Sequence, residues 1–228
     1  MRNIEKNLHH IVDTIEKTKQ ENELSYDITI VAATKTQPFS LIEKIYSLGI
    51  NNIGENRIQE AVSKFGTFKD MPNIVRRFIG HLQSNKVNKF LEMFDTIDSI
   101  DSSKLANKIN NKAATLKKSI PALLEINTSG DKNKKGFSPK LSDDIIHCMN
   151  LDHINVNGLM TLGPFSRDED ETRQAFVDLR KFSDTLNKEH GGEKLTNLSM
   201  GMSGDYVIGI QEGSTMVRVG TSLFGPRK

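Results

Sequence analysis

The chain has 228 residues, and its 31 lysines and arginines nearly balance its 29 aspartates and glutamates, for a formal net charge of +2. This balance argues against a nucleic-acid-binding or membrane-surface protein, and the sequence shows neither a signal peptide nor an apolar run of membrane-spanning length. The single cysteine, Cys148, excludes an internal disulfide and lies in a helical pattern, so we expect a buried structural thiol in a soluble, cytoplasmic protein.

Residues 2–23 predict a helix that precedes the rest of the fold. Charged residues separate apolar positions that recur at helical spacing, namely Ile4, Leu8, Ile11, Val12 and Ile15. This spacing predicts one apolar face that packs against the protein.

After this helix, short apolar runs alternate with amphipathic stretches. Eight runs predict strands, at residues 28–34, 51–56, 76–81, 93–100, 120–129, 154–162, 195–200 and 215–225. The helices predicted between them include 40–49, 102–116 and 168–190. Ser40 and Asp168 are predicted N-caps, and Gly49 and Gly191 are predicted helix stops.

This alternation predicts a parallel α/β protein. The number of strands favours a closed (β/α)8 TIM-type barrel with an extra N-terminal helix, and an open doubly wound sheet is the alternative. No linker or low-complexity tract divides the chain, so we expect one domain over residues 1–228. Active sites of such barrels lie at the C-terminal strand ends, and polar or functional residues gather there: Lys35, Glu55, Asn56, His81, Asp98, Asp101, Asn127, Thr161, Met200 and Arg218.

Lys35 stands at the end of the first predicted strand, in "VAATKTQP". An ammonium group does not enter an apolar core unpaired. The lysine therefore either extends its amine to solvent along the strand end or acts chemically, as a nucleophile that forms a Schiff base. The strand alone does not decide between these two hypotheses.

Two further motifs follow predicted strands. In "IGENRIQE" (53–60), Gly54 permits a close backbone approach, and Asn56 either binds a ligand or caps the next helix. In "FIGHLQSNK" (78–86), His81 follows a buried strand, where a lone histidine is more often structural than catalytic. No second histidine or cysteine stands at metal-ligand spacing from it, so we expect no metal site.

The segment "LSMGMSGDY" (198–206) is small and polar after a strand. It approaches the G-x-S-x-G nucleophile elbow, but Asp205 replaces the last glycine. Gly201, Ser203 and Gly204 instead predict a phosphate cradle of backbone N–H groups and a hydroxyl.

The last predicted strand lies in "MVRVGTSLFG" (216–225). Arg218 interrupts its apolar run, so we expect the guanidinium to point into the barrel mouth or a polar pocket. Gly220 and Thr221 add an N–H group and a hydroxyl, and phosphate sites of such barrels commonly use the loops after the last two strands.

The segment "SGDKNKKGF" (129–137) holds Lys132, Lys134 and Lys135. These lysines indicate a solvated loop, and attraction of an anionic ligand is the alternative.

A strand-end lysine, a phosphate cradle and an arginine between them suit pyridoxal 5′-phosphate (PLP). The lysine would form an imine with the aldehyde, the cradle would hold the phosphate, and one group would face the pyridine nitrogen.

On these motifs the chain resembles the pyridoxal-phosphate homeostasis proteins, relatives of the N-terminal barrel of alanine racemase. The resemblance runs nearly end to end and rests on "VAATKTQP", "IGENRIQE", "FIGHLQSNK", "NGLMTLGP", "SMGMSGD" and "GSTMVRVGTSLFG". It implies a PLP barrel of fold type III. The family usually has Trp-His before "FIG", where this chain has Arg76 and Arg77. At a strand start, away from the mouth, these two are expected to affect local surface contacts more than cofactor binding.

The resemblance implies roles for seven residues. Lys35 forms the Schiff base with PLP, and Arg218 faces the pyridine nitrogen. Asn56 and Met200 are implied to be pocket walls. Three residues match phosphate-binding positions of the related racemase barrel: Ser203, Gly220 and Thr221.

The resemblance also implies a function in intracellular PLP homeostasis, by storage, buffering or delivery, without enzymatic activity. A fold type III PLP enzyme, such as an amino-acid racemase, is the alternative. The chain ends three residues after "SLFG", so we expect no second domain to supply the base that racemisation needs on the second face. Arg218 would also weaken the cofactor as an electron sink, but this arginine alone does not decide between the two functions, because the racemases share it. We expect a monomer that binds PLP and other B6 vitamers, with apo PLP-dependent enzymes as partners.

Overall fold

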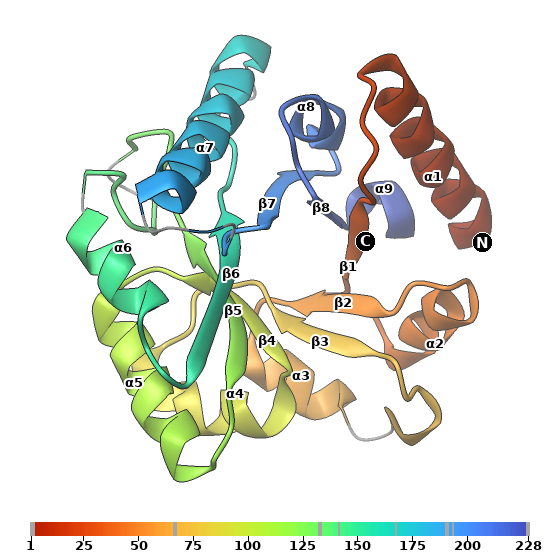
Figure 1. The fold of residues 1–228 in the computed structure, drawn as a ribbon. Helices are drawn as coiled ribbons and strands as arrows, with labels where there is room; N and C mark the ends of the chain where they lie inside the picture. The colour runs from red at the N-terminus through yellow and green to blue at the C-terminus, as the bar shows by residue number, and fades with distance from the viewer. Residues whose placement is uncertain are drawn as a thin grey trace.

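Eight parallel strands close into a barrel in which each strand pairs with the next one along the chain (Figure 1). The computed structural model describes residues 3–65, 68–131, 134–140, 142–166, 168–189, 192 and 194–226. The strands are β1 (Thr29–Ala33), β2 (Asn52–Glu55), β3 (Val75–Phe78), β4 (Thr96–Ile100), β5 (Ile120–Glu125), β6 (Ile154–Met160), β7 (Asn197–Met202) and β8 (Met216–Val219). The predicted closed barrel is confirmed, and the open-sheet alternative is wrong.

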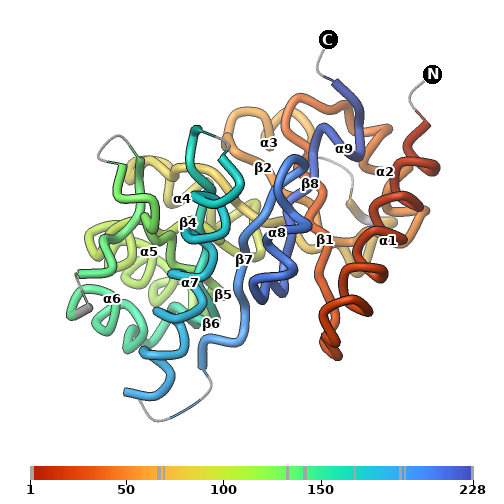
Figure 2. Tube along the Cα trace, turned by 90° about the horizontal axis from the view of Figure 1, so that it is seen from above, coloured from red at the N-terminus to blue at the C-terminus, as the bar shows by residue number. Residues whose placement is uncertain are grey.

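Helices surround the barrel on its outside (Figure 1), and the view from above shows α5 and α6 on the side opposite α1 and α2 (Figure 2). Following α1 (Ile4–Glu21), they are α2 (Phe39–Ser47), α3 (Ile58–Lys64), α4 (Val87–Met93), α5 (Ser103–Thr115), α6 (Ser142–Met149), α7 (Glu169–Glu189), α8 (Tyr206–Gln211) and α9 (Thr221–Phe224). Two single 3-10 turns are η1 (Phe68–Asp70) and η2 (Ser84–Lys86). Among the helices of the described residues, none is long and apolar enough to cross a membrane.

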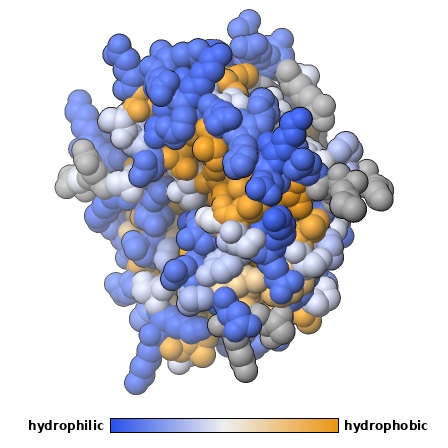
Figure 3. All heavy atoms as spheres, turned by 90° about the vertical axis from the view of Figure 1, so that its right-hand side faces the viewer, coloured by the Kyte–Doolittle hydropathy of each residue, from blue (hydrophilic) through white to orange (hydrophobic). Residues whose placement is uncertain are grey.

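The predicted N-terminal helix is confirmed as α1, which packs against α8 and α9. The Asn3 side chain caps it by accepting a hydrogen bond from the Lys6 N–H at 3.0 Å. Four of the predicted apolar positions are buried: Ile4, Leu8, Ile11 and Ile15. Val12 is partly exposed, so its assignment to the packed face is wrong. Other apolar atoms reach the surface among polar ones on the side of the molecule that carries α1 and α2 (Figure 3).

The predicted helix ends have different outcomes. Helix α2 begins at Phe39 after Pro38, so Ser40 is not its N-cap. Gly49 adopts φ +91°, which confirms it as a stop because glycine takes this conformation without steric cost. Asp168 is confirmed as a cap, since its Oδ1 accepts the Glu171 N–H at 3.0 Å. Gly191 lies outside the described residues.

The last predicted strand was too long. Strand β8 ends at Val219, and the chain turns at Gly220 into the short helix α9. The hydroxyl and N–H groups that follow the strand therefore sit on a helical turn, which brings successive N–H groups to one side.

Successive side chains of each strand point alternately into the barrel and toward the helices, so they form an inner and an outer layer. Four apolar side chains form a layer of their own, Val31, Leu123, Met160 and Met216. Larger apolar clusters fill the space between barrel and helices. Cys148 of α6 lies in this outer layer with no exposed surface, and burial raises the pKa of its thiol to about 12, which confirms a structural thiol.

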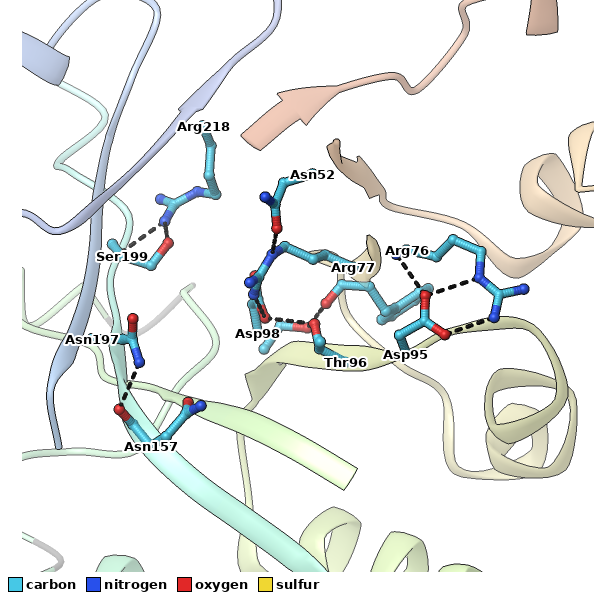
Figure 4. A network of polar contacts seen from close by, with 12 residues as sticks. Asn52, Arg76, Arg77, Asp95, Thr96, Asp98, Asn157, Asn197, Ser199 and Arg218 are labelled. Atoms are coloured by element: carbon cyan, nitrogen blue, oxygen red, sulfur yellow. Dashed lines mark hydrogen bonds and ion pairs between the residues drawn. The ribbon is translucent and has the colours of Figure 1, made fainter. Parts of the chain in front are cut away.

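Polar side chains fill part of the barrel interior (Figure 4). The Arg77 guanidinium donates to Asp98 at 3.0 Å and to Asn52 Oδ1 at 2.9 Å, and Thr96 Oγ1 donates to Asp98 at 3.0 Å. The Asp98 side chain is 1% exposed. The expectation that Arg77 affects surface contacts is therefore wrong, because the neighbouring Phe78 packs outward and turns Arg77 inward.

Arg76 does lie at the barrel surface. Its guanidinium forms a two-bond pair with Asp95, at 2.6 and 2.9 Å (Figure 4). Both side chains are about one-third exposed, at 29% and 37%. The side chains of the two adjacent arginines of β3 thus lie on opposite faces of the strand.

Candidate functional site at the C-terminal end of the barrel

Lys35 follows β1 at the C-terminal end of the barrel and is half-buried. It lies in a turn that is closed by the hydrogen bond from the Gln37 N–H to the Thr34 carbonyl, at 2.9 Å. The alternation of β1 places Val31 and Ala33 on the same side of the strand, and Lys35 lies in the turn two residues after Ala33. The structure therefore places Lys35 at the end where barrel active sites lie.

Arg218 of β8 points into the barrel and is 4% exposed. Its guanidinium donates to the Ser199 carbonyl at 2.8 Å and to Ser199 Oγ at 2.6 Å (Figure 4). It also donates to the Thr161 carbonyl at 2.8 Å. Burial lowers the pKa of Arg218, while the negative charges of Asp98 and Asp205 act in the opposite direction. These fixed bonds make Arg218 a rigid cation below the mouth.

Ser203 is the centre of a small donor group between β7 and β8. Its Oγ accepts the N–H groups of Gly220 at 3.0 Å and Ser222 at 3.1 Å, and it lies 3.1 Å from Ser222 Oγ. Two backbone N–H groups that converge on one oxygen form a site that suits an anionic oxygen. Ser222 was missed in the sequence, because only the turn into α9 brings its N–H to this point.

The donor group is adjacent to β1. A Cβ added to Gly220 would lie 3.6 Å from Ala33 Cβ, so the end of β8 contacts the residue two positions before Lys35. The barrel closure, in which Thr29 pairs with Met216, fixes this neighbourhood. Lysine, arginine and donor group thus belong to the adjacent strands β7, β8 and β1.

The end of β7, from Met200 to Met202, is also tightly held. Asp205 Oδ1 accepts the Met202 N–H at 2.5 Å, and Gly201 adopts φ +95°. A Cβ at Gly201 would lie 2.8 Å from Tyr206 Cα, so only glycine fits here. Met200 is fully buried in the outer apolar layer; its role as a pocket wall stays a prediction.

Asn56 follows β2, next to the mouth. Its Oδ1 is buried, and it has no hydrogen-bond partner within the part of the chain that the structure describes. The backbone beside it is crowded, because a Cβ at Gly80 would lie 2.4 Å from the Asn56 carbonyl oxygen. The close backbone approach predicted for Gly54 therefore occurs at Gly80. At Gly54 a Cβ would meet the Ile79 side chain instead.

The opposite side of the mouth is acidic. His81 Nδ1 lies 2.6 Å from Asp101 Oδ2, so the histidine is held by a carboxylate from the end of β4. Glu125 ends β5, and burial, reinforced by the negative charge of Asp101, raises its pKa to about 7. Glu125 was not singled out in the sequence, because the pattern of apolar residues around it does not show whether its carboxylate is buried or exposed.

Lys134 connects two loops of the mouth. Its Nζ donates to the Gly163 carbonyl at 2.6 Å and lies 4.8 Å from the centre of the Phe165 ring. Burial lowers its pKa. The solvated-loop interpretation is therefore wrong for Lys134, whereas Lys135 is exposed and Lys132 lies outside the described residues. A cavity of about 230 Å³ lies here, lined by Ser129, Asp131, Lys134, Pro164, Phe165, Ser166 and Glu171.

No group of three or more histidine, cysteine or acidic side chains in the described ranges is arranged to hold a metal ion. The chemistry of the mouth instead comes from an amine, a guanidinium, hydroxyls and backbone N–H groups. This donor set fits PLP. Ser203 and the N–H groups suit a phosphate, and Lys35 is the primary amine that an aldehyde requires. The unpaired Asn56 Oδ1 marks a further polar position that a ligand could satisfy.

Comparisons with known proteins identify the family and the fold. Residues 3–228 match the family described as "Alanine racemase, N-terminal domain". The chain is 37% identical to the "Pyridoxal phosphate homeostasis protein" of Aquifex aeolicus, covering 87% of each chain. It is 35% identical to the protein of the same name from Haemophilus influenzae, covering 99% of this chain and 96% of the other.

Solved structures show the same fold. An unknown protein from Bifidobacterium adolescentis superposes with a TM-score of 0.91 at 36% identity, over 97% of this chain and 94% of the other. PipY of Synechococcus elongatus with PLP bound gives a TM-score of 0.81 at 33% identity, over 93% and 100% of the chains. Alanine racemase of Clostridium difficile shares the fold alone, with 20% identity and a TM-score of 0.75, over 97% of this chain and 57% of the racemase. The chain therefore belongs to the pyridoxal phosphate homeostasis protein family, within the group built on the alanine racemase N-terminal barrel.

Proposed function

We propose that this protein binds PLP and acts in its homeostasis, by storing, buffering or delivering the cofactor. The observation that carries the proposal is that Lys35 follows β1 at the same end of the barrel as the Ser203, Gly220 and Ser222 donor group, which lies next to the end of β1. Relatives that match along nearly the whole chain are named for this role, and PipY has been solved with PLP bound.

In this proposal each group has one task. The aldehyde of PLP supplies a reversible Schiff-base linkage to an amine. Lys35 provides that amine, and Ser203, Gly220 and Thr221 bind the phosphate. Arg218 faces the pyridine nitrogen, held in place by its bonds to Ser199. Asn56 contributes its side chain to the pocket wall, and Met200 contributes its main chain, because its side chain lies in the outer apolar layer.

We further propose that the protein is a carrier and not an enzyme. The named relatives are homeostasis proteins. A guanidinium at the pyridine nitrogen opposes its protonation and weakens the cofactor as an electron sink. Other B6 vitamers are proposed as further ligands, apo PLP-dependent enzymes as partners, a monomer as the working state and the cytoplasm as the location.

The test is to identify the lysine that carries PLP. Protein loaded with PLP should show a visible absorption band, and borohydride reduction should label the peptide that contains Lys35. Lys35→Ala should lose the band and stay folded, whereas Lys44→Ala, at an exposed lysine of α2, should keep it. A band of full intensity in Lys35→Ala, or reductive labelling of another lysine alone, would contradict the assignment.

A further inference from the structure

Helix α3 contacts the main chain on both sides of Lys35. Lys64 Nζ donates to the carbonyl oxygen of Thr34 at 2.8 Å. Glu60 Oε2 accepts the N–H of Thr36 at 3.1 Å. Residues four positions apart lie on the same face of a helix, so one helical face holds the residue before Lys35 and the residue after it.

The contact before Lys35 is part of a buried network. Lys64 Nζ also donates to Glu55 Oε1 at 2.8 Å, and the same oxygen accepts the Thr34 hydroxyl at 2.7 Å. The Glu55 side chain has no exposed surface, and that of Lys64 is 11% exposed. Because an unpaired buried charge is strongly unfavourable, these bonds restrict Thr34 to one position.

The contact after Lys35 coincides with an unusual backbone conformation. Thr36 adopts φ +63°, in the left-handed region that a β-branched residue rarely enters. The turn is closed by the Gln37 N–H on the Thr34 carbonyl, the oxygen that Lys64 also binds. Such a conformation persists only where the surrounding structure enforces it, and it is typical of functional sites.

We propose that Glu60 and Lys64 are positioning residues that fix the backbone around Lys35, so that its amine meets the aldehyde of PLP in the orientation required for capture. The inference rests on the proposed function of Lys35. Both residues act through the Lys35 backbone and not on the cofactor. In this capture the Lys35 nitrogen would replace the aldehyde oxygen, which leaves as water. A tether held in the reactive geometry accelerates this step because little orientational freedom remains to be lost.

The experiment compares two ligands that differ at the reacting group. PLP carries the aldehyde, whereas pyridoxine 5′-phosphate carries an alcohol there and cannot form the Schiff base. Lys64→Met should weaken PLP binding about tenfold and slow the growth of the visible band, and Glu60→Ala, at the more exposed contact, about threefold. Affinity for pyridoxine 5′-phosphate should change by less than about twofold in both variants.

Two further variants serve as controls. Glu60→Gln keeps an acceptor oxygen for the Thr36 N–H and should restore the wild-type rate of capture. Lys89→Met removes an exposed lysine of α4 that pairs with Glu92 at 2.8 Å, and it should leave both ligands unaffected. If Lys64→Met does not fold, the comparison of Glu60→Ala with Glu60→Gln tests the same proposal.

Equal weakening of both ligands would show that Glu60 and Lys64 support the fold alone and would overturn the positioning role. Unchanged capture of PLP in Lys64→Met and Glu60→Ala would overturn it as well. If Lys35→Ala keeps a visible absorption band of wild-type intensity, the proposed function of Lys35 is overturned instead. Failure of the positioning role and failure of the proposed function are therefore distinguishable.

Discussion

At the scale of single residues, the phosphate site makes a prediction about ligand discrimination. Replacing both Ser203 and Thr221 with alanine should weaken PLP binding more than pyridoxal binding, because pyridoxal has no phosphate. A hydrogen bond to a charged acceptor contributes about 1–3 kcal/mol. Titration of both ligands by absorption measures the difference, and Ser47→Ala, at an exposed position of α2, is the control. An equal loss for both ligands would contradict the proposed phosphate site.

Glu125 makes a prediction about pH. Burial raises its pKa from the ordinary 4.5 to about 7, so between these values the folded protein holds a proton that the unfolded chain has released. The free energy of unfolding should therefore fall as pH rises through this window, by about 3 kcal/mol from this residue.

Glu125→Gln removes this titration. Urea unfolding of the PLP-free protein at pH 5 and pH 8 should show a smaller loss of stability in Glu125→Gln than in the wild type. Glu92→Gln, at an exposed position of α4, should behave as the wild type. If all three proteins lose the same stability between the two pH values, Glu125 does not titrate as described.

At the scale of elements, β3 carries two adjacent arginines with different environments. Arg77→Met would leave Asp98 buried without its cation and should cost about 3–5 kcal/mol of the free energy of unfolding. Arg76→Met breaks a pair that is about one-third exposed and should cost at most about 1 kcal/mol. Urea unfolding measures both.

Restoring Arg77→Met by the second change Asp98→Leu distinguishes a charge effect from a packing effect. The double variant should recover most of the lost stability, because neither buried charge remains. Similar costs for Arg76→Met and Arg77→Met would contradict the inward placement of Arg77.

Periodicity made the strands and the closed barrel predictable, because strands covered on both faces form apolar runs. Lys35 and Arg218 were recognisable for the same reason, as cations within or at the end of such runs. Periodicity does not report a polar barrel interior, so Arg77 was placed at the surface. Periodicity also does not report which residues the polar face of a helix contacts. The hydrogen bonds of Glu60 and Lys64 to the main chain around Lys35 were therefore missed.

At the scale of the whole molecule, the proposed delivery role predicts transfer of the cofactor. Protein loaded with PLP should restore the activity of an unrelated apo PLP enzyme without added cofactor, because the Schiff base to Lys35 is reversible. A small-molecule trap for free PLP separates direct transfer from release and rebinding. Retention of PLP for hours in the presence of excess apo-enzyme would leave storage as the better description.

Closure of the barrel also determines when the site can exist. Asn7 donates to the Leu223 carbonyl across 216 residues of sequence, and β1 pairs with β8. Lys35 is made before the Ser203, Gly220 and Ser222 donors, which follow it by at least 168 positions. A chain still growing on the ribosome therefore has the reactive amine without the phosphate donors, and capture of the cofactor at the assembled site becomes a property of the finished chain alone.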